Sequence, residues 1–159
     1  MAKRVAIRKP PRGFSRFFYR FPILFYKWGW GGLFGKRMLL LNHTGRKSGL
    51  PRKAVLEVVN LDPETNTFII NVGFGPKTDW YQNLLAQPNA SIMVGKEMIE
   101  VHAASIKGEA GGNFLLGYSQ QHPKGAKMIS KLLGYEVDGT HEDWRALGEQ
   151  LIFVQLSPR

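Results

Sequence analysis

Apolar residues along this chain occur in short runs, and the pattern predicts a domain built mainly of strands. The runs are separated by glycine, proline, asparagine and aspartate, which favour tight turns. Hairpin turns are expected at Asp62 to Asn66 and at Val94 to Glu97. The expected strands are Met38 to Asn42, Ala54 to Asn60, Thr67 to Val72, Ser91 to Val94 and Met98 to Ile106, with Leu151 to Leu156 as the closing strand.

Helical patterns are fewer, and they lie between or after the expected strands. Thr78 is suited to cap a short helix that reaches Gln87. A longer helical region is expected from Asn113 to Leu133, with a break near His122, and a last helix is expected to start at Thr140. Strands joined by hairpins, with a helix inserted between them, predict an α+β but mainly β fold. The expected form is a split antiparallel barrel with peripheral helices rather than a doubly wound parallel sheet.

The N-terminal part of the chain is rich in aromatic and basic residues. Residues 1–32 are expected to form a basic aromatic arm or helix, and residues 33–159 are expected to form the barrel domain. Aromatic side chains between residues 14 and 28 recur on one helical face with Arg and Lys between them. Such a segment suits contact with an anionic membrane, or packing on the barrel wall that closes a pocket. The apolar run from Phe21 to Phe34 is well short of the ~20 apolar residues of a spanning helix.

The charge of the chain is distributed unevenly. The net charge is +10, and residues 1–56 contain 14 of the 22 Lys and Arg but no Asp or Glu. The remainder has 22 − 14 = 8 basic and all 12 acidic residues. This polarity predicts an anionic partner. Nucleic acid is not expected, since no nucleic-acid motif is present and the C-terminal part offers no matching basic groove.

Cysteine and histidine exclude several kinds of site. The chain has no cysteine, which excludes disulfides and thiolate sites. The lack of cysteine also fits a cytoplasmic protein. Peripheral attachment at the inner membrane face is a further expectation, which comes from the basic aromatic segment. The four histidines are scattered along the sequence without metal-ligand spacing, so no metal site is expected. No pattern of a serine-type triad is present either.

The most informative motif is a basic turn between two expected strands, Thr44 to Lys53. Four cations fall within eight positions, beside two glycines and a serine hydroxyl. Guanidinium forks and bent backbone suit phosphate or carboxylate groups. The spacing of the nucleotide-binding P-loop is absent. Two interpretations of the turn, an anion-binding site and a solvated hairpin loop, are therefore consistent with the sequence.

A second motif, Asn71 to Asn83, follows an expected strand. Its glycine loop leads into a helix N-terminus, a geometry that favours anions and flat ligands. Lys77 adds a positive charge, and Trp80 is suited either to pack against an aromatic ligand or to join the core. The dinucleotide fingerprint is not met, because the third glycine is missing after Gly73 and Gly75.

In this order the two motifs resemble the deazaflavin-dependent nitroreductase family, within the wider split β-barrel flavin and deazaflavin oxidoreductases. The matching segments are Thr-Gly-Arg-Lys-Ser-Gly-x-Pro-Arg and, after the glycine loop, Asp-Trp-Tyr-x-Asn-Leu. The similarity runs from about Leu33 to the C-terminus. The resemblance implies an FMN-binding split-barrel-like fold and coenzyme F-420 in preference to FMN. Coenzyme F-420 is an 8-hydroxy-5-deazaflavin with a phospholactyl group and a polyglutamate tail.

The resemblance also implies cofactor contacts for particular residues. The anionic part of F-420 would meet the basic turn, and the ring would lie along the glycine loop, with Trp80 positioning it. The chain has Gly73 and Phe74 where family members often have a small polar residue and a charge, which predicts a more hydrophobic ring pocket. The implied cofactor-binding residues are Arg46, Lys47 and Ser48 in the turn, Arg52, Lys53 and Ala54 on the next strand, and Val72, Gly73, Phe74, Lys77 and Trp80 in the second motif.

The implied reaction is hydride transfer from the reduced deazaflavin to a lipophilic small molecule, such as a quinone, an activated alkene or a nitro compound. No motif fixes the proton donor, and Tyr118 and Tyr135 are the catalytic candidates. Two other functions stay open. One is a split-barrel oxidoreductase that uses FMN or FAD, and the other is a non-catalytic module that binds anionic membranes.

Overall fold

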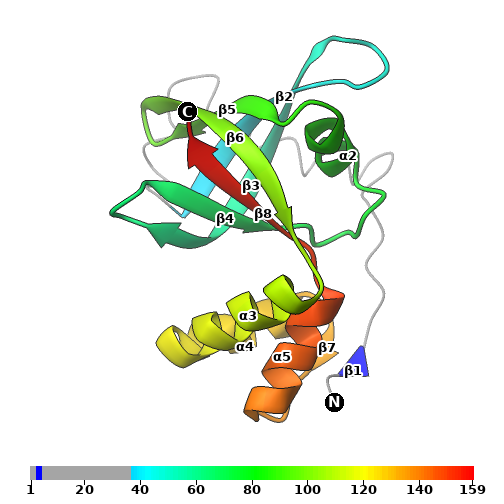
Figure 1. Cartoon of the computed structure of the whole chain (residues 1–159), viewed down its shortest axis with the longest axis vertical. Coiled ribbons are helices and arrows are strands. Elements are labelled where there is room, and N and C mark those ends of the chain that lie inside the picture. The colour runs from blue at the N-terminus through cyan, green and yellow to red at the C-terminus, as the bar shows by residue number, and fades with distance from the viewer. Residues whose placement is uncertain (1–2, 5–36) are drawn as a thin grey trace.

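The computed structural model describes residues 3–4 and 37–159, and within them it confirms the expected barrel (Figure 1). Six strands close an antiparallel barrel in the order β2-β3-β4-β8-β6-β5. The fold is therefore mainly β with peripheral helices, as the sequence predicts. The barrel strands are β2 (Met38–Thr44), β3 (Pro51–Asp62), β4 (Thr67–Asn71), β5 (Asn89–Val94), β6 (Glu97–Ile106) and β8 (Phe153–Pro158).

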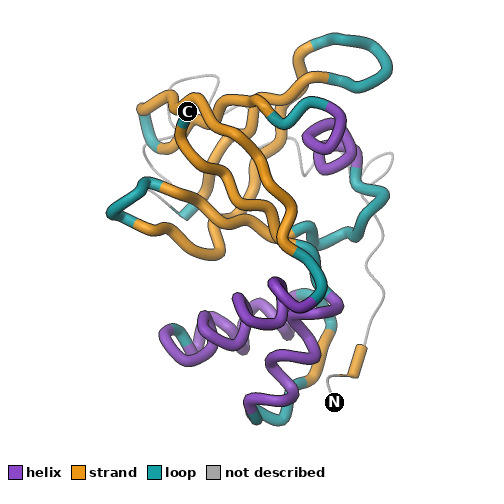
Figure 2. The backbone as a smooth tube through the Cα atoms, viewed as in Figure 1, coloured by secondary structure: helices purple, strands orange, loops and turns teal. Residues whose placement is uncertain are grey.

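The hairpin of β2 and β3 is longer than the apolar pattern indicates. Its ladder continues to the pair Thr44 and Pro51, so the turn itself is residues 45–50. Most residues of these last pairs are polar and at least partly exposed at the end of the barrel, while His43 among them is buried. Gly49 has a φ of +70°, a backbone conformation that favours glycine. Figure 2 shows this turn projecting beyond the barrel next to α2.

The barrel encloses one hydrophobic core, and the helices enclose another. Alternate residues of each strand point inward, as the period of two requires. Leu39, Leu41, Ile70 and Ile92 are almost fully buried in the interior cluster. Phe153, which starts β8, belongs instead to a second cluster shared with the helices. The strands near the helices are thus apolar on both faces.

Helices occupy two places around the barrel (Figure 1). Helix α2 (Asp79–Ala86) lies near the β2–β3 turn, while α3 (Glu109–Gln121), α4 (Pro123–Leu132) and α5 (His141–Gln150) form a separate layer. The N-cap of α5 is Thr140, as predicted, and its hydroxyl accepts a hydrogen bond from Asp143 N at 3.2 Å. The short strands β1 (Lys3–Arg4) and β7 (Tyr135–Glu136) pair antiparallel beside this layer.

Helices α3 and α5 cross at very short range because glycines meet at the crossing. A Cβ on Gly112 would lie 2.9 Å from Arg145 O, and one on Gly148 would lie 2.8 Å from the Cβ of Leu115. Real Cβ atoms do not approach this closely, so the crossing requires glycine at both positions.

The predicted N-terminal arm or helix lies outside the described residues, apart from Lys3–Arg4. Within the described part, no helix combines the length and the apolarity that crossing a membrane would require.

Candidate functional site

The two sequence motifs meet at one end of the barrel, where Arg46 of the basic turn contacts α2. The backbone N–H of Arg46 donates to Asn83 Oδ1 at 3.0 Å, and its Nη1 donates to the same oxygen at 2.8 Å. The Nη2 of Arg46 lies 3.3 Å from Asp79 Oδ1 in an ion pair. Asn83 is 5% exposed whereas Arg46 and Asp79 are exposed, so a buried amide fixes the exposed turn against the helix.

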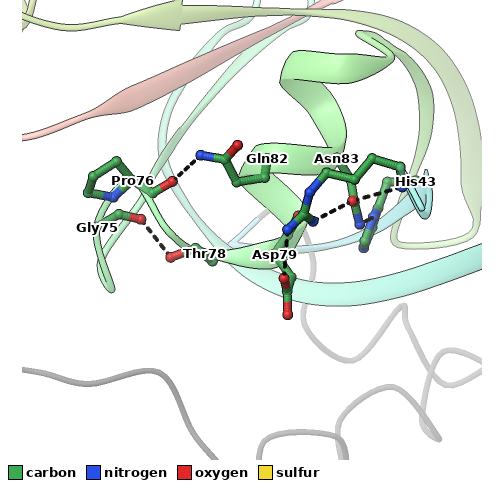
Figure 3. A network of polar contacts seen from close by, with 8 residues as sticks. His43, Gly75, Pro76, Thr78, Asp79, Gln82 and Asn83 are labelled. Atoms are coloured by element: carbon green, nitrogen blue, oxygen red, sulfur yellow. Dashed lines mark hydrogen bonds and ion pairs between the residues drawn. The ribbon is translucent and has the colours of Figure 1, made fainter. Parts of the chain in front are cut away.

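Asn83 also connects the turn to β2. Its Nδ2 lies 3.1 Å from Nδ1 of His43, which is 8% exposed (Figure 3). The pKa of His43 is lowered to about 4, first by burial and then by the charge of Arg52, with Asp79 acting in the opposite direction. His43 is therefore neutral at physiological pH.

Two of the three remaining cations of the basic turn, Lys47 and Arg52, are exposed and have no ion-pair partner in the described part of the chain. A Cβ placed on Gly45 would lie 2.5 Å from Ser48 Oγ and 3.7 Å from Arg52 Nε. Ser48 and Arg52 therefore converge over the bare backbone of Gly45, which concentrates donors at one point.

The strand register separates Lys53 from Arg52. Arg52 pairs with His43, whereas Lys53 pairs with Asn42 and so faces the other side of the sheet. There Lys53 Nζ donates to Asn42 Oδ1 at 2.9 Å. Ala54 is half-buried on the same side as Arg52. The structure thus brings Arg52 and Ala54, but not Lys53, to the side that carries His43.

The glycine loop begins at the barrel and ends at α2. Val72 is buried, and its N–H donates to Ile152 O at 2.9 Å. Gly73 and Phe74 are half-buried, and a Cβ on Gly73 would meet the side chain of Leu133 at 3.3 Å. The loop therefore offers a close backbone approach between the barrel and the helical layer.

The second half of the loop is fixed by its own hydrogen bonds (Figure 3). Thr78 Oγ1 donates to Gly75 O at 2.7 Å, and Gln82 Nε2 donates to Pro76 O. Lys77 is exposed at the entrance to α2. Trp80 is half-buried against the barrel core, so part of its ring area stays accessible. The interpretation of Trp80 as a core residue is thus correct for one part of its surface.

The two candidate tyrosines lie in different surroundings. Tyr135 is 7% exposed within the helical core. Tyr118 is half-buried, and its pKa is raised, first by burial and then by the charge of Glu57. It opens onto a pocket of about 320 Å³ between β3 and α3. That pocket is lined by Arg37, Val58, Val59, Asn60, Leu61, Tyr118 and His122.

Sequence reasoning did not single out His43 or Asn83. A signal for His43 exists, because it follows Leu39 and Leu41 in the same alternation and therefore shares their buried face. Asn83 lies one helical turn after Asp79, on the same face of α2. Only the three-dimensional contacts of Asn83, with Arg46 on one side and His43 on the other, show that Asn83 and His43 belong to the same place in the fold. Within the described ranges, no cluster of three metal-ligating side chains occurs.

Comparisons with known proteins show the family of the chain. The model of the F-420H(2)-dependent quinone reductase family matches residues 28–128, which is most of the chain. The chain belongs to this family. It is therefore an oxidoreductase of the deazaflavin-dependent kind, which confirms the resemblance seen in the two motifs. The comparison with curated proteins gave no match.

Several solved structures resemble this chain, and one with a TM-score above 0.5 supports the fold. A protein of unknown function from Agrobacterium tumefaciens is 16% identical with a TM-score of 0.53, covering 94% of this chain and 58% of that protein. An F-420-H2 dependent reductase, FDR-A, is 17% identical with a TM-score of 0.44, covering 76% of this chain and 95% of that one. A general stress protein 26 relative from Clostridium acetobutylicum is 10% identical with a TM-score of 0.47, covering 85% and 84%.

Proposed function

We propose that this protein binds reduced coenzyme F-420 at the β2–β3 turn and glycine loop, and that it passes a hydride to a lipophilic acceptor, with a quinone as the first candidate. The observation that carries the proposal is the contact of Arg46 with Asn83 and Asp79. It holds a cationic turn and a half-buried glycine loop at the same end of the barrel. One end of such a site suits an anionic chain, and the other suits a flat ring.

The chemistry of the donors supports the anionic end. Lys47 and Arg52 provide charge, and Ser48 adds a hydroxyl beside Arg52 over Gly45. Phosphate and carboxylate groups are the ligands that such a set recognises, since guanidinium and ammonium donors form strong charge-assisted hydrogen bonds with them. Lys77 would extend the same positive region toward α2.

The glycine loop supports the ring end. Gly73 and Phe74, which follow the buried Val72, offer backbone and apolar surface, and the accessible part of Trp80 offers an aromatic one. A deazaflavin is flat and apolar over most of its area, so it suits such a surface. Lys53 and Arg46 have secondary roles in this proposal, because Lys53 faces the other side of the sheet and the guanidinium of Arg46 is bonded to α2.

The bound deazaflavin would supply the hydride, and the protein would supply orientation and exclusion of water. Arg46 would keep the turn and α2 at a fixed separation, so that the ring and its anionic chain are held together. Reduction of a quinone also needs a proton. Tyr118 is the more accessible of the two tyrosine candidates, because it lines a pocket whereas Tyr135 is buried, and its raised pKa keeps it protonated at neutral pH.

The reaction is tested with reduced F-420 and a short-chain naphthoquinone, with the fluorescence of oxidised F-420 as the readout. We expect reoxidation in proportion to enzyme and consumption of one quinone per F-420. A parallel assay with an aromatic nitro compound tests the wider acceptor range. If F-420 binds but neither acceptor reoxidises it, the proposed reaction is wrong although the cofactor site is correct.

The position of the enzyme in the cell is part of the same proposal. A quinone dissolves in the lipid bilayer, and the basic aromatic segment of residues 14–28 would bring the enzyme to an anionic membrane from the cytoplasmic side. Co-sedimentation with vesicles that contain anionic lipid tests this contact. Binding that is equal for neutral vesicles would contradict it.

A further inference from the structure

His43 is a buried polar residue at the mouth of the barrel that the proposed chemistry leaves without a role. It lies directly opposite Arg52 in the β2–β3 ladder, on the same side of the sheet. Cβ atoms of such opposed residues are about 4.5–5.5 Å apart. His43 therefore lies beside the point where Arg52 and Ser48 converge over Gly45.

The hydrogen bonds around Asn83 determine which nitrogen of His43 carries the proton. The N–H and the guanidinium of Arg46 can only donate, and both meet the same side-chain oxygen of Asn83. The other atom of the Asn83 amide is therefore its NH2 group, which donates to Nδ1 of His43. A nitrogen that accepts a hydrogen bond carries no proton, so the proton of the neutral ring is on Nε2.

Burial, and after it the charge of Arg52, keep the ring of His43 neutral. Arg52 faces the ring from β3, while Asp79 of α2 acts on its pKa in the opposite direction. Burial is the largest cause of the lowered pKa of about 4. A neutral ring adds an N–H donor beside Arg52 without the like-charge repulsion that another cation would introduce.

The Nε2 atom is accessible from outside. Among the described residues, the structure gives His43 one hydrogen bond, and that bond uses Nδ1. Nε2 is also absent from the fully buried polar atoms without a partner. An unpartnered atom that is not fully buried keeps some exposed surface, so Nε2–H is free to donate a hydrogen bond to a group that approaches from outside.

We propose that His43 binds the ligand, with its Nε2–H donating a hydrogen bond to an anionic oxygen that Arg52 also holds. The oxygen belongs to a phosphate or a carboxylate. The inference rests on the proposed function, because it takes the anionic part of F-420 as the ligand. Asn83 and Arg46 act through His43 by fixing its tautomer, so they are positioning residues.

Two variants separate the two nitrogens of the ring. The amide of His43→Asn occupies the place of Nδ1 and keeps an acceptor for Asn83, but it has nothing at Nε2. The amide of His43→Gln reaches the place of Nε2 and keeps the donor. We expect H43N to raise the Kd for F-420 about tenfold, as loss of one hydrogen bond to a charged group implies, and H43Q to stay within about threefold of the parent protein.

The choice of ligand identifies the anionic oxygen. F-420 without glutamates retains the phosphate, and the deazaflavin riboside lacks both phosphate and tail. An H43N effect that persists with the first ligand and vanishes with the second assigns the contact to the phosphate. An H43N effect that appears only with glutamate-bearing F-420 assigns the contact of His43 to a carboxylate of the tail. Equal Kd values for H43N and the parent protein with full-length F-420 would overturn the inference, provided that both variants show the parent's thermal unfolding.

A measurement on the free protein keeps this test separate from the proposed cofactor. The ¹⁵N NMR spectrum of the histidine rings at pH 7 should show His43 neutral, with Nε2 protonated and Nδ1 unprotonated. A proton on Nδ1, or a charged ring, would overturn the inference whatever F-420 does. If the tautomer is correct but the parent protein does not bind F-420, the proposed function fails.

In that case, addition of inorganic pyrophosphate to the free protein tests whether His43 contacts an anion. A shift of the His43 Nε2 resonance supports the inference, and an unchanged resonance contradicts it.

Discussion

Arg46 and Asn83 are joined by two hydrogen bonds to one oxygen, from the backbone N–H of Arg46 at 3.0 Å and from its Nη1 at 2.8 Å. This pair brings two separate sequence motifs together at one end of the barrel, because Arg46 belongs to the basic turn and Asn83 to the helix after the glycine loop. It also divides the cations of the turn by role. Arg46 is a structural clamp, while Lys47 and Arg52 are available to a ligand.

Removal of the clamp should lower stability. Arg46→Ala removes the side-chain donor to Asn83 Oδ1 but keeps the backbone N–H bond to the same oxygen, so the expected cost is that of one hydrogen bond, about 0.5–1.5 kcal/mol. We expect a loss of this order in the free energy of unfolding from urea denaturation. Lys47→Ala is the matched control from the same turn, and it should stay within about 0.5 kcal/mol of the parent protein because Lys47 is exposed. Equal losses for both variants would contradict the clamp.

The free cations of the turn should determine how F-420 binding depends on salt. Screening weakens attraction between exposed charges, so affinity should fall as NaCl is raised. Lys47→Ala and Arg52→Gln should each raise the Kd for F-420 and reduce its dependence on salt. Lys96→Ala is a suitable control, since Lys96 is exposed in the β5–β6 turn. A control variant with the same loss as the turn variants would indicate a general charge effect instead of a site.

The crossing of α3 and α5 predicts opposite effects for two glycines. Gly148→Ala would place a methyl group 2.8 Å from the Cβ of Leu115, and overpacking of this kind costs about 1–3 kcal/mol. Nothing lies within 4 Å of a Cβ on Gly117, which is inside α3. Gly117→Ala should therefore stabilise the helix by about 0.5–1 kcal/mol. Thermal unfolding of the two variants measures this, and two shifts of the same sign would contradict the crossing.

The buried His43 should make stability depend on pH in a specific range. The pKa of His43 falls from its ordinary value of 6.5 to about 4 on folding, so between these values the unfolded chain binds more protons than the folded one. The stabilisation that comes from keeping His43 neutral is therefore complete above pH 6.5 and is lost as the pH falls toward 4. The melting temperature should decline less steeply over that range in His43→Gln. Parallel curves for the two proteins would show that His43 does not titrate in this way.

The sequence predicts the barrel because its strands have short, strongly apolar segments such as Leu39 to Leu41, bounded by turn residues. It predicts the strand ends less well. Thr44 and Pro51 extend the β2–β3 ladder without any apolar signal, because backbone pairing and not side-chain burial holds them there. The ends of β2 and β3 depend on pairing with the partner strand, and a local pattern of apolar residues holds no information about that pairing.

The same limit applies to the site. The basic turn is evident from the density of cations, and the residues around Trp80 are evident from the glycine loop that precedes them. The separate roles of Arg46 and Arg52 are not evident, since both are arginines in one motif. They differ only because Asn83, 37 positions after Arg46, folds against one of them. The proposed role of His43 is not evident from the sequence for a similar reason, because it depends on a contact with a distant amide.

The central claim is that the β2–β3 turn and the glycine loop bind a deazaflavin with an anionic chain. The most direct test is a fluorescence titration of the purified protein with F-420, FMN and FAD at low salt, repeated with Arg52→Gln. The account predicts saturable binding of F-420, much weaker binding of FMN and FAD, and a clear loss of F-420 affinity in the variant. Absence of F-420 binding, or F-420 binding that Arg52→Gln leaves unchanged, would contradict it.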